Sequence, residues 1–232
     1  MITVRRSDQR GRTKIDWLDS RHTFSFGDYY DRSAMGFSVL RVINEDRVVG
    51  GGGFPTHPHR DMEIVTWVLE GALEHRDSIG NGSVIRPGDA QRMSAGSGIR
   101  HSEFNASKHT PVHFLQIWLM PAAEGIDPGY EQRNFPESTR RGQLRLVVSG
   151  DGADGSIVIH QDARMYDGIL KAGAGTVYNL APLRRAYLQV ARGQVQANKV
   201  SLGAGDGAAI ENETGLDLKA QSDSEVVLFD LP

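Results

Sequence analysis

The sequence contains no cysteine, and this absence limits the chemistry available to the chain. Without a thiol, the protein cannot form a disulfide, hold a zinc ribbon or an iron–sulfur cluster, or use a cysteine nucleophile. Any metal site must therefore be built from nitrogen and oxygen ligands.

Charge of one sign and long apolar runs are also lacking. The formal net charge is only −3, so there is no basic footprint of the kind that neutralises nucleic-acid phosphates. No apolar run approaches the length that spans a membrane, and the N-terminal stretch MITVRRSDQRGRTK has no signal-peptide core. These absences predict a soluble, cytoplasmic protein that does not bind nucleic acid or a membrane directly.

Glycine, in contrast, is abundant. The 27 glycines separate many short runs rich in valine, isoleucine and leucine, such as residues 37–42 and 112–120. The dipeptide Asn81-Gly82 is a typical hairpin turn between two such runs. Short strands that recur about every ten residues with turns between them predict an all-β sandwich or barrel.

A polar, proline-containing stretch follows Pro121 and divides the strand-like runs into two arrays. We therefore predict an N-terminal β domain at residues 1–121, an inter-domain linker at residues 122–142 and a C-terminal β domain at residues 143–232.

The two arrays resemble each other, which indicates an internal duplication. The segment Trp67–Gly71 resembles Tyr187–Gly193, and Ile85–Ala90 resembles Leu202–Gly207. The C-terminal array has no histidine pair at the corresponding place, so we expect it to share the fold and to lack metal ligands.

The chemistry is concentrated in the stretch Gly51–Gly71. His57 and His59 are two residues apart and precede an apolar run. Residues i and i+2 of a strand point to the same face, so both imidazoles can point at one metal ion. Imidazole is the commonest transition-metal ligand in proteins, and this pair predicts half of a metal site.

A second pair follows in the same predicted domain. His101 and Glu103 are also at i and i+2, so two facing strands could supply three imidazoles and a carboxylate and leave positions open for a substrate or O₂. Glu63 competes for the role of the carboxylate ligand, because unbroken alternation would place it on the face of His59. We favour Glu103, with Glu63 as the alternative.

The remaining histidines have no partner at strand spacing and are interpreted as structural residues. They are His22, His75, His109, His113 and His160. His113 shares a face with Leu115 and Ile117, so an alternative is that it lines the same pocket.

Two motifs resemble those of the cupin superfamily: G-x5-H-x-H from Gly51 to His59, and G-x2-H-x3-N from Gly98 to Asn105. The longer strings HTFSFGDYYD, FPTHPHRDMEIVTWVLEG, MSAGSGIRHSEFN and LQIWLMP, together with the C-terminal VVLFDLP, resemble the pirin family of bicupins. The resemblance extends over nearly the whole chain. It implies an all-β fold of two tandem cupin-type β-barrels with few short helices.

The ligand set departs from the general cupin pattern. That pattern places a glutamate seven residues before the closing glycine, where this chain has Ile64. Pirins instead have a three-histidine, one-glutamate iron site whose glutamate lies two residues after the third histidine. The resemblance therefore implies His57, His59, His101 and Glu103 as metal ligands.

The resemblance also implies Fe(II), with other divalent metals possible, and quercetin 2,3-dioxygenase activity. A flavonol and O₂ would be the substrates, Glu103 would serve as ligand and as the base for the 3-hydroxyl proton, and the heterocycle would open with release of carbon monoxide. The aromatic residues predicted to line the pocket are Phe24, Phe26, Phe54, Phe104, Phe114 and Trp118.

A second hypothesis is an iron-dependent regulatory protein that modulates a protein partner without physiological turnover, as the resemblance implies for nuclear relatives. A basic patch near the site would favour it, but the candidates Arg60, Arg92 and Arg100 are scattered. Isomerase or other cupin chemistry at the same metal is a third possibility, since fold alone does not decide function.

Overall fold

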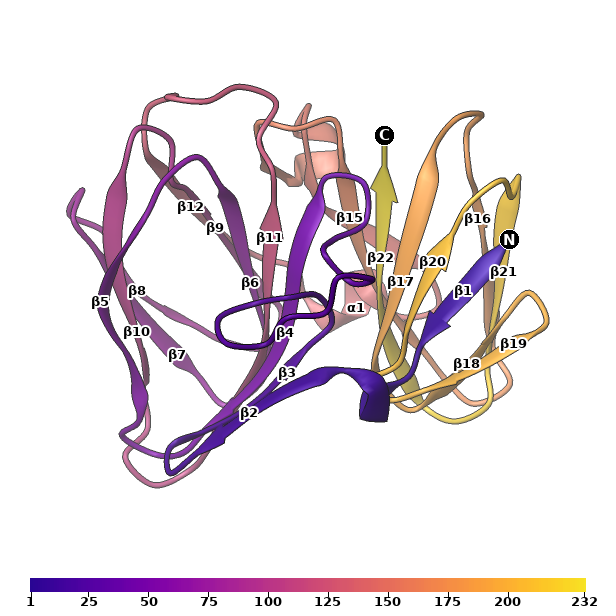
Figure 1. Ribbon diagram of the computed structural model, residues 1–232. Helices are drawn as coiled ribbons and strands as arrows, with labels where there is room; N and C mark the ends of the chain where they lie inside the picture. The colour runs from indigo at the N-terminus through magenta and orange to yellow at the C-terminus, as the bar shows by residue number, and fades with distance from the viewer. The chain divides into compact units, whose positions relative to one another are not determined.

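The computed structural model describes residues 1–232 and divides into two compact units. The N-terminal barrel comprises Gly11–Asn134 with Ile159–Gln161, and the C-terminal barrel comprises Met1–Arg10, Phe135–Val158 and Asp162–Pro232. Each unit consists of one seven-stranded and one four-stranded sheet (Figure 1). The predicted all-β fold is confirmed.

The N-terminal barrel contains eleven of the strands. They are β2 (Gly11–Ile15), β3 (Leu18–His22), β4 (Leu40–Val48), β5 (Gly53–His59), β6 (Glu63–Glu70), β7 (Leu73–Asp77), β8 (Gly82–Ile85), β9 (Asp89–Ser94), β10 (Ile99–Asn105), β11 (Val112–Leu119) and β12 (Gly129–Asn134). The strand order is β12-β9-β6-β11-β4-β3-β2 in the larger sheet and β5-β10-β7-β8 in the smaller one.

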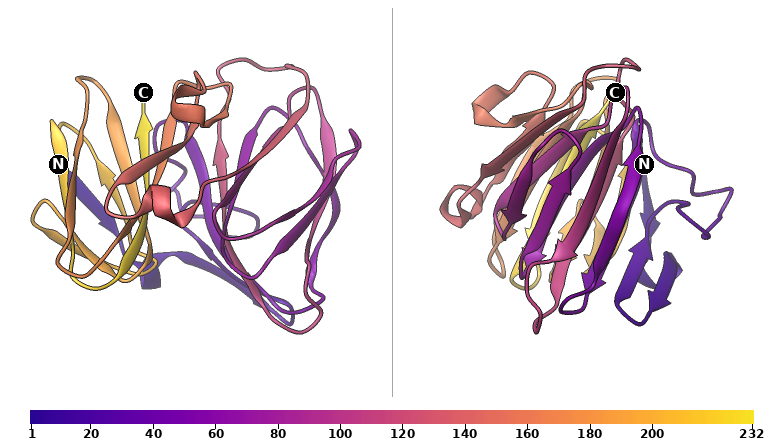
Figure 2. Two further views of the ribbon diagram at one scale, coloured as in Figure 1. Left: turned by 180° about the vertical axis from the view of Figure 1, so that it is seen from behind. Right: turned by 90° about the vertical axis from the view of Figure 1, so that its left-hand side faces the viewer.

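The C-terminal barrel contains the other strands and the three short helical segments. They are β1 (Ile2–Arg5), η1 (Ser7–Gln9), α1 (Glu137–Arg140), β13 (Leu144–Ser149), η2 (Ala153–Gly155), β14 (Ile157–Val158), β15 (Arg164–Leu170), β16 (Gly175–Asn179), β17 (Arg185–Arg192), β18 (Gln194–Ala197), β19 (Val200–Gly203), β20 (Gly207–Ile210), β21 (Gly215–Ala220) and β22 (Ser224–Leu231). Both α1 and η2 are visible as short salmon coils in the left panel of Figure 2. None of the helical segments has the length and apolar character needed to cross a membrane.

The two barrels repeat one topology. The C-terminal sheets have the orders β1-β20-β17-β22-β15-β13-β14 and β16-β21-β18-β19. They match the N-terminal orders except at the two edges of the larger sheet, where β14 pairs in parallel and β1 comes from the start of the chain. The segments that resemble each other in sequence fall on corresponding strands, β6 and β17. Strand order therefore supports the predicted duplication.

The predicted domain boundaries need correction at both ends of the N-terminal domain. Strand β1 pairs with β20 of the C-terminal barrel, with Ile2 opposite Ile210. Within the predicted linker, β12 pairs with β9, with Gly129 opposite Ser94. Both strands cover the edge of a sheet. The side chains of β12 are polar and half-exposed, which is why this segment resembles a linker in the sequence.

One part of the interior of the N-terminal barrel is apolar. A cluster that includes Val68, Leu73, Ile85 and Phe114 fills this part. In the C-terminal barrel, strand β21, which corresponds to β10, contributes Leu216 and Leu218 to a continuous apolar core. The two interiors therefore differ in the residues that their similar backbones carry.

We predict that Arg140→Ala strongly destabilises the C-terminal barrel. The buried guanidinium donates to the carboxylate of Asp167 and, at 3.3 Å, to Glu225. Burial and then Glu225 raise the pKa of Asp167, against the opposing effect of Arg140. Loss of one partner of a buried pair costs about 3–5 kcal/mol. The loss should be larger above the pKa of Asp167 than below it, where protonation of Asp167 relieves part of it.

Chemical denaturation measures this loss. Arg141→Ala is the control, because Arg141 forms an exposed i,i+4 pair with Glu137 that should contribute at most about 0.5 kcal/mol. Equal losses in the two variants would contradict the prediction.

Candidate metal centre

Strands β5 and β10 place the predicted ligands opposite one another. In this antiparallel pair His101 faces His57, and Ile99 faces His59. Strand β5 lies at the edge of its sheet, where Pro55 and Pro58 are tolerated because an edge strand leaves some N–H groups unpaired. The paired register thus directs His57, His59 and His101 to one face, as the i, i+2 spacing predicted.

An irregularity in this pairing fixes the orientation of His57. Between His101 and Glu103 the partner residue shifts from His57 to Phe54, so β5 carries a bulge at Pro55. The ring Nδ1 of His57 lies 2.7 Å from the carbonyl oxygen of Pro55. Because a carbonyl can only accept, Nδ1 carries the proton and Nε2 is free to bind a metal.

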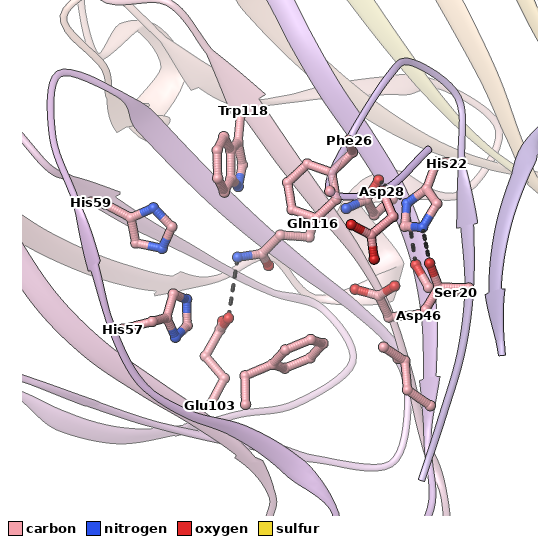
Figure 3. Close-up of a pocket in the computed structure, with 15 residues that line it drawn as sticks. Ser20, His22, Phe26, Asp28, Asp46, His57, His59, Glu103, Gln116 and Trp118 are labelled. Carbon is pink, nitrogen blue, oxygen red and sulfur yellow. Dashed lines mark hydrogen bonds between the residues drawn. The ribbon is translucent and has the colours of Figure 1, made fainter. Parts of the chain in front are cut away.

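Three imidazoles converge on one point. The ligand atoms of His57, His59 and His101 all lie within 4.8 Å of one another. The Nε2 atoms of His57 and His101 are 3.1 Å apart. Figure 3 shows the rings of His57 and His59 side by side at one end of a pocket.

The surroundings keep His59 and His101 in the neutral form that binds metals. Burial, with a smaller effect of His57, lowers the pKa of His59 to about 4. Burial and then the neighbouring histidines lower the pKa of His101 to about 2. A neutral imidazole presents a lone pair, so protons compete little with a cation here.

The donor set fits a divalent metal. Metal–nitrogen distances near 2.1 Å place adjacent ligand atoms about 3 Å apart, which matches the spacing of the His57 and His101 Nε2 atoms. The Nε2 atom of His59 is buried and has no hydrogen-bond partner. Such an orphaned atom costs free energy unless a ligand satisfies it.

Glu103 lies beside this group rather than within it. Its carboxylate belongs to an overlapping group with His75 and His101. Gln116 Nε2 donates to Oε2 at 3.2 Å (Figure 3), and the Thr66 hydroxyl lies 3.3 Å from Oε1. Burial, then the nearby Asp46, raises the pKa of Glu103 to about 7. Its role as the fourth ligand stays a prediction.

Glu63, the alternative carboxylate, belongs to neither group. The alternation that would have placed it beside His59 is broken, because β5 ends at His59 and Asp61 adopts a positive φ of 47° before β6 begins. Its buried carboxylate accepts from Ser94 at 2.9 Å and faces His160 Nδ1 at 3.2 Å. Glu63 therefore takes part in a separate pair with His160.

The prediction that His75 is a structural residue does not take Asp77 into account. His75 and Asp77 form a third i, i+2 pair on β7, next to β10. The ring Nδ1 of His75 lies 3.4 Å from Nδ1 of His101, and its Nε2 lies 3.1 Å from Asp77. The H-x-D spacing was the sequence signal that could have identified it.

The other histidines lie apart from the three-histidine group. His113 does not line the pocket, since it bonds to Glu45 at 2.9 Å. His22 does line the pocket, with its two ring nitrogens bonded to Thr13 and Asn44. His109 is exposed in the loop after β10.

The pocket beside the imidazoles has a volume of about 230 Å³. Its lining comprises Thr13, Leu18, Ser20, His22, Phe26, Gly27, Asp28, Asn44, Asp46, Phe54, His57, His59, Glu103, Gln116 and Trp118. Trp118 contacts His59 edge to face at 4.9 Å and Phe26 at 5.3 Å. At the end of the pocket away from His57 and His59, Figure 3 shows His22, Asp28 and Asp46.

Only part of the predicted aromatic wall lines the pocket. Phe26, Phe54 and Trp118 do. Phe104 is exposed, because it alternates with Glu103 and points outward, whereas Phe114 is buried in the apolar cluster deeper in the barrel. Phe24 is buried outside the lining.

Two similar β-barrels, one with histidines converging beside a pocket, define a bicupin with a candidate divalent-metal site. Family models agree: a pirin model matches residues 3–119, and a quercetinase C-terminal cupin domain matches residues 146–231. The chain belongs to the pirin family.

Relatives match over the full length. A quercetin 2,3-dioxygenase of Escherichia coli K12 is 50% identical over 100% of this chain and 99% of its own length. A pirin-like protein of Caulobacter vibrioides is 43% identical over 99% of each chain. The crystal structure of the E. coli bacterial pirin YhhW in complex with nickel(II) has a TM-score of 0.95 at 50% identity, and covers 100% of this chain and 99% of that one.

We predict that His59→Ala and His101→Ala each weaken nickel(II) binding by at least the 10–100-fold that loss of an outer-shell partner costs, because each removes a predicted ligand nitrogen. Competition against a chromophoric chelator measures the affinity. His109→Ala is the matched control, since His109 is an exposed imidazole of the same barrel outside the cluster. An equal loss in the control would contradict the assignment.

Proposed function

We propose that the protein is a metal-dependent dioxygenase that opens the heterocycle of flavonols such as quercetin with O₂. The proposed ligands are His57, His59, His101 and Glu103, and the proposed metal is Fe(II), with other divalent metals possible. The convergence of three imidazoles at one end of a pocket with aromatic walls carries this proposal. The names of relatives that match the full chain support it.

When bound, the metal would act as a Lewis acid toward the 3-hydroxyl and 4-carbonyl of a flavonol. The chain's own residues would bind and orient the substrate. Phe26, Phe54 and Trp118 provide apolar surface for a flat polyphenol.

Glu103 is the proposed base for the 3-hydroxyl proton. A base works best when its pKa lies near the working pH, and burial raises the pKa of this carboxyl to about 7. Gln116 and Thr66 contact the two oxygens and orient the group. The aspartate Asp46 faces the same pocket and adds to the rise in pKa.

The direct test is turnover. The protein is freed of metal, reconstituted without oxygen with Fe(II), Mn(II), Ni(II), Cu(II) or Zn(II), and given quercetin and O₂. We expect oxygen uptake with release of carbon monoxide for at least one metal. Tight metal binding without turnover for any of these metals would sink the dioxygenase proposal.

The two glutamates separate the competing assignments. We expect Glu103→Gln to lower kcat by about 10²–10⁴, as loss of a general base does. Glu63→Gln is the matched control, since Glu63 is an equally buried glutamate bonded to Ser94; it should lower stability and leave kcat within a few-fold. Loss of metal affinity in Glu63→Ala, with full affinity in Glu103→Ala, would reverse the assignment.

The regulatory alternative gains no support from the three arginines. Arg92 is buried and bonded to Ser94 at 3.1 Å, so only Arg60 and Arg100 are exposed. Two exposed arginines do not form the basic patch that the regulatory hypothesis requires.

A further inference from the structure

A chain of hydrogen-bonding groups extends behind His101, away from the pocket. The Nε2 atom of His101 faces His57, and its Nδ1 atom lies 3.4 Å from Nδ1 of His75. The Nε2 atom of His75 in turn lies 3.1 Å from Oδ2 of Asp77. An imidazole of the candidate metal centre is thus connected to a carboxylate through a second imidazole.

The strand register builds this chain. In the pairing of β10 with β7, Asp77 lies opposite His101 and His75 lies opposite Glu103. All four side chains therefore point to the interior face of the small sheet, and His75 sits diagonally from His101. His75 and the side chain of Asp77 have no exposed surface, so water does not compete for these bonds.

Only one proton arrangement satisfies every contact together with metal binding. Asp77 can only accept, so His75 Nε2 carries a proton and His75 Nδ1 is an acceptor. His101 Nδ1 must then carry a proton and donate it to His75, which leaves the lone pair on His101 Nε2. That lone pair faces the other imidazoles of the cluster.

Asp77 is held firmly at the far end of the chain. Its Oδ1 accepts from the backbone N–H groups of Ile79 at 3.1 Å and Asn81 at 2.9 Å. Its Oδ2 accepts from the Asn81 side chain at 3.0 Å, in addition to His75. The ring of Tyr130 packs against His75 with centroids 5.0 Å apart at 31°, which restricts the rotation of the imidazole.

We infer that His75 is a positioning residue for the metal centre. Together with Asp77 it holds His101 in the tautomer and ring orientation that direct Nε2 at a divalent cation. The inference rests on the proposed metal centre, whose third histidine it concerns. Partners that accept a hydrogen bond from a ligating imidazole typically contribute 10–100-fold to metal affinity.

The same residues allow a competing explanation. His75, His101 and Glu103 have ligand atoms within 4.8 Å of one another, so they could hold a second ion through the Nδ1 side of His101. The series of hydrogen bonds from His101 to Asp77 is compatible with one metal ion per polypeptide, whereas the competing explanation requires two ions. Metal stoichiometry therefore decides between them.

The test compares two substitutions at residue 75 in the full-length protein. His75→Phe keeps the ring volume but removes the acceptor for His101, and we expect nickel(II) to bind 10–100-fold more weakly at an unchanged one ion per chain. His75→Gln has an oxygen that can accept from His101 and an N–H that can donate to Asp77. It should recover at least about tenfold of the lost affinity.

His113→Phe is the matched control. His113 is also a buried histidine that contacts a carboxylate, Glu45, in the same barrel, and it lies outside both histidine groups. We expect this variant to lower the melting temperature and to bind nickel(II) as the unmodified protein does. A comparable loss of affinity in this control would show that destabilisation alone explains the effect of His75→Phe.

A spectroscopic measurement tests the proton arrangement independently of activity and affinity. Long-range ¹H–¹⁵N spectra of the zinc(II)-loaded protein should show the proton of His101 on Nδ1 and that of His75 on Nε2. A proton on His75 Nδ1 would overturn the inference.

The outcomes separate the two proposals. If His101→Ala weakens nickel(II) binding and His75→Phe does not, the metal centre stands and the positioning role fails. If His101→Ala also binds normally, the metal centre itself fails. Two ions per chain, with one lost in His75→Phe, would replace the hydrogen-bonded chain with a second metal site.

Discussion

The pairing of β5 with β10 is the constraint on which the candidate centre depends. Strand alternation directs His57, His59 and His101 into the interior of the barrel, beside an apolar cluster. Burial there favours neutral imidazoles, and it leaves Nε2 of His59 without a partner. Burial of His59 Nε2 without a partner costs the folded protein free energy, and a bound cation would recover it by accepting the lone pair.

The duplicated topology shows how separable the scaffold and the chemistry are. Both barrels have the same order of strands in the smaller sheet and in the centre of the larger one. The strand that carries His101 and Glu103 in one barrel corresponds to β21 in the other, where Leu216 and Leu218 enter an apolar core. Since the side chains that point inward do not take part in the backbone hydrogen bonds, the interior can change from ligands to leucine while the ladder of strands is kept.

Much of the centre could be predicted because its signals are local. The i, i+2 spacing of His57 and His59, and of His101 and Glu103, depends only on strand geometry. The assignment of Glu63 to a different pair could not be predicted securely, since it depends on the turn at Asp61 that ends one strand before the next. The polar segment that forms β12 resembles a linker for a related reason: its pairing partner, β9, lies elsewhere in the chain.

The sequence by itself determined the all-β class, the absence of thiol chemistry, the duplication and the histidine pairs, because composition and periodicity act over a few residues. Only the tertiary structure decided which pairs meet. It placed His75 and Asp77 behind His101 and brought Gln116 to Glu103. The contacts His75–His101 and Gln116–Glu103 join residues on different strands. They follow from how the strands pair and pack, which no local pattern specifies.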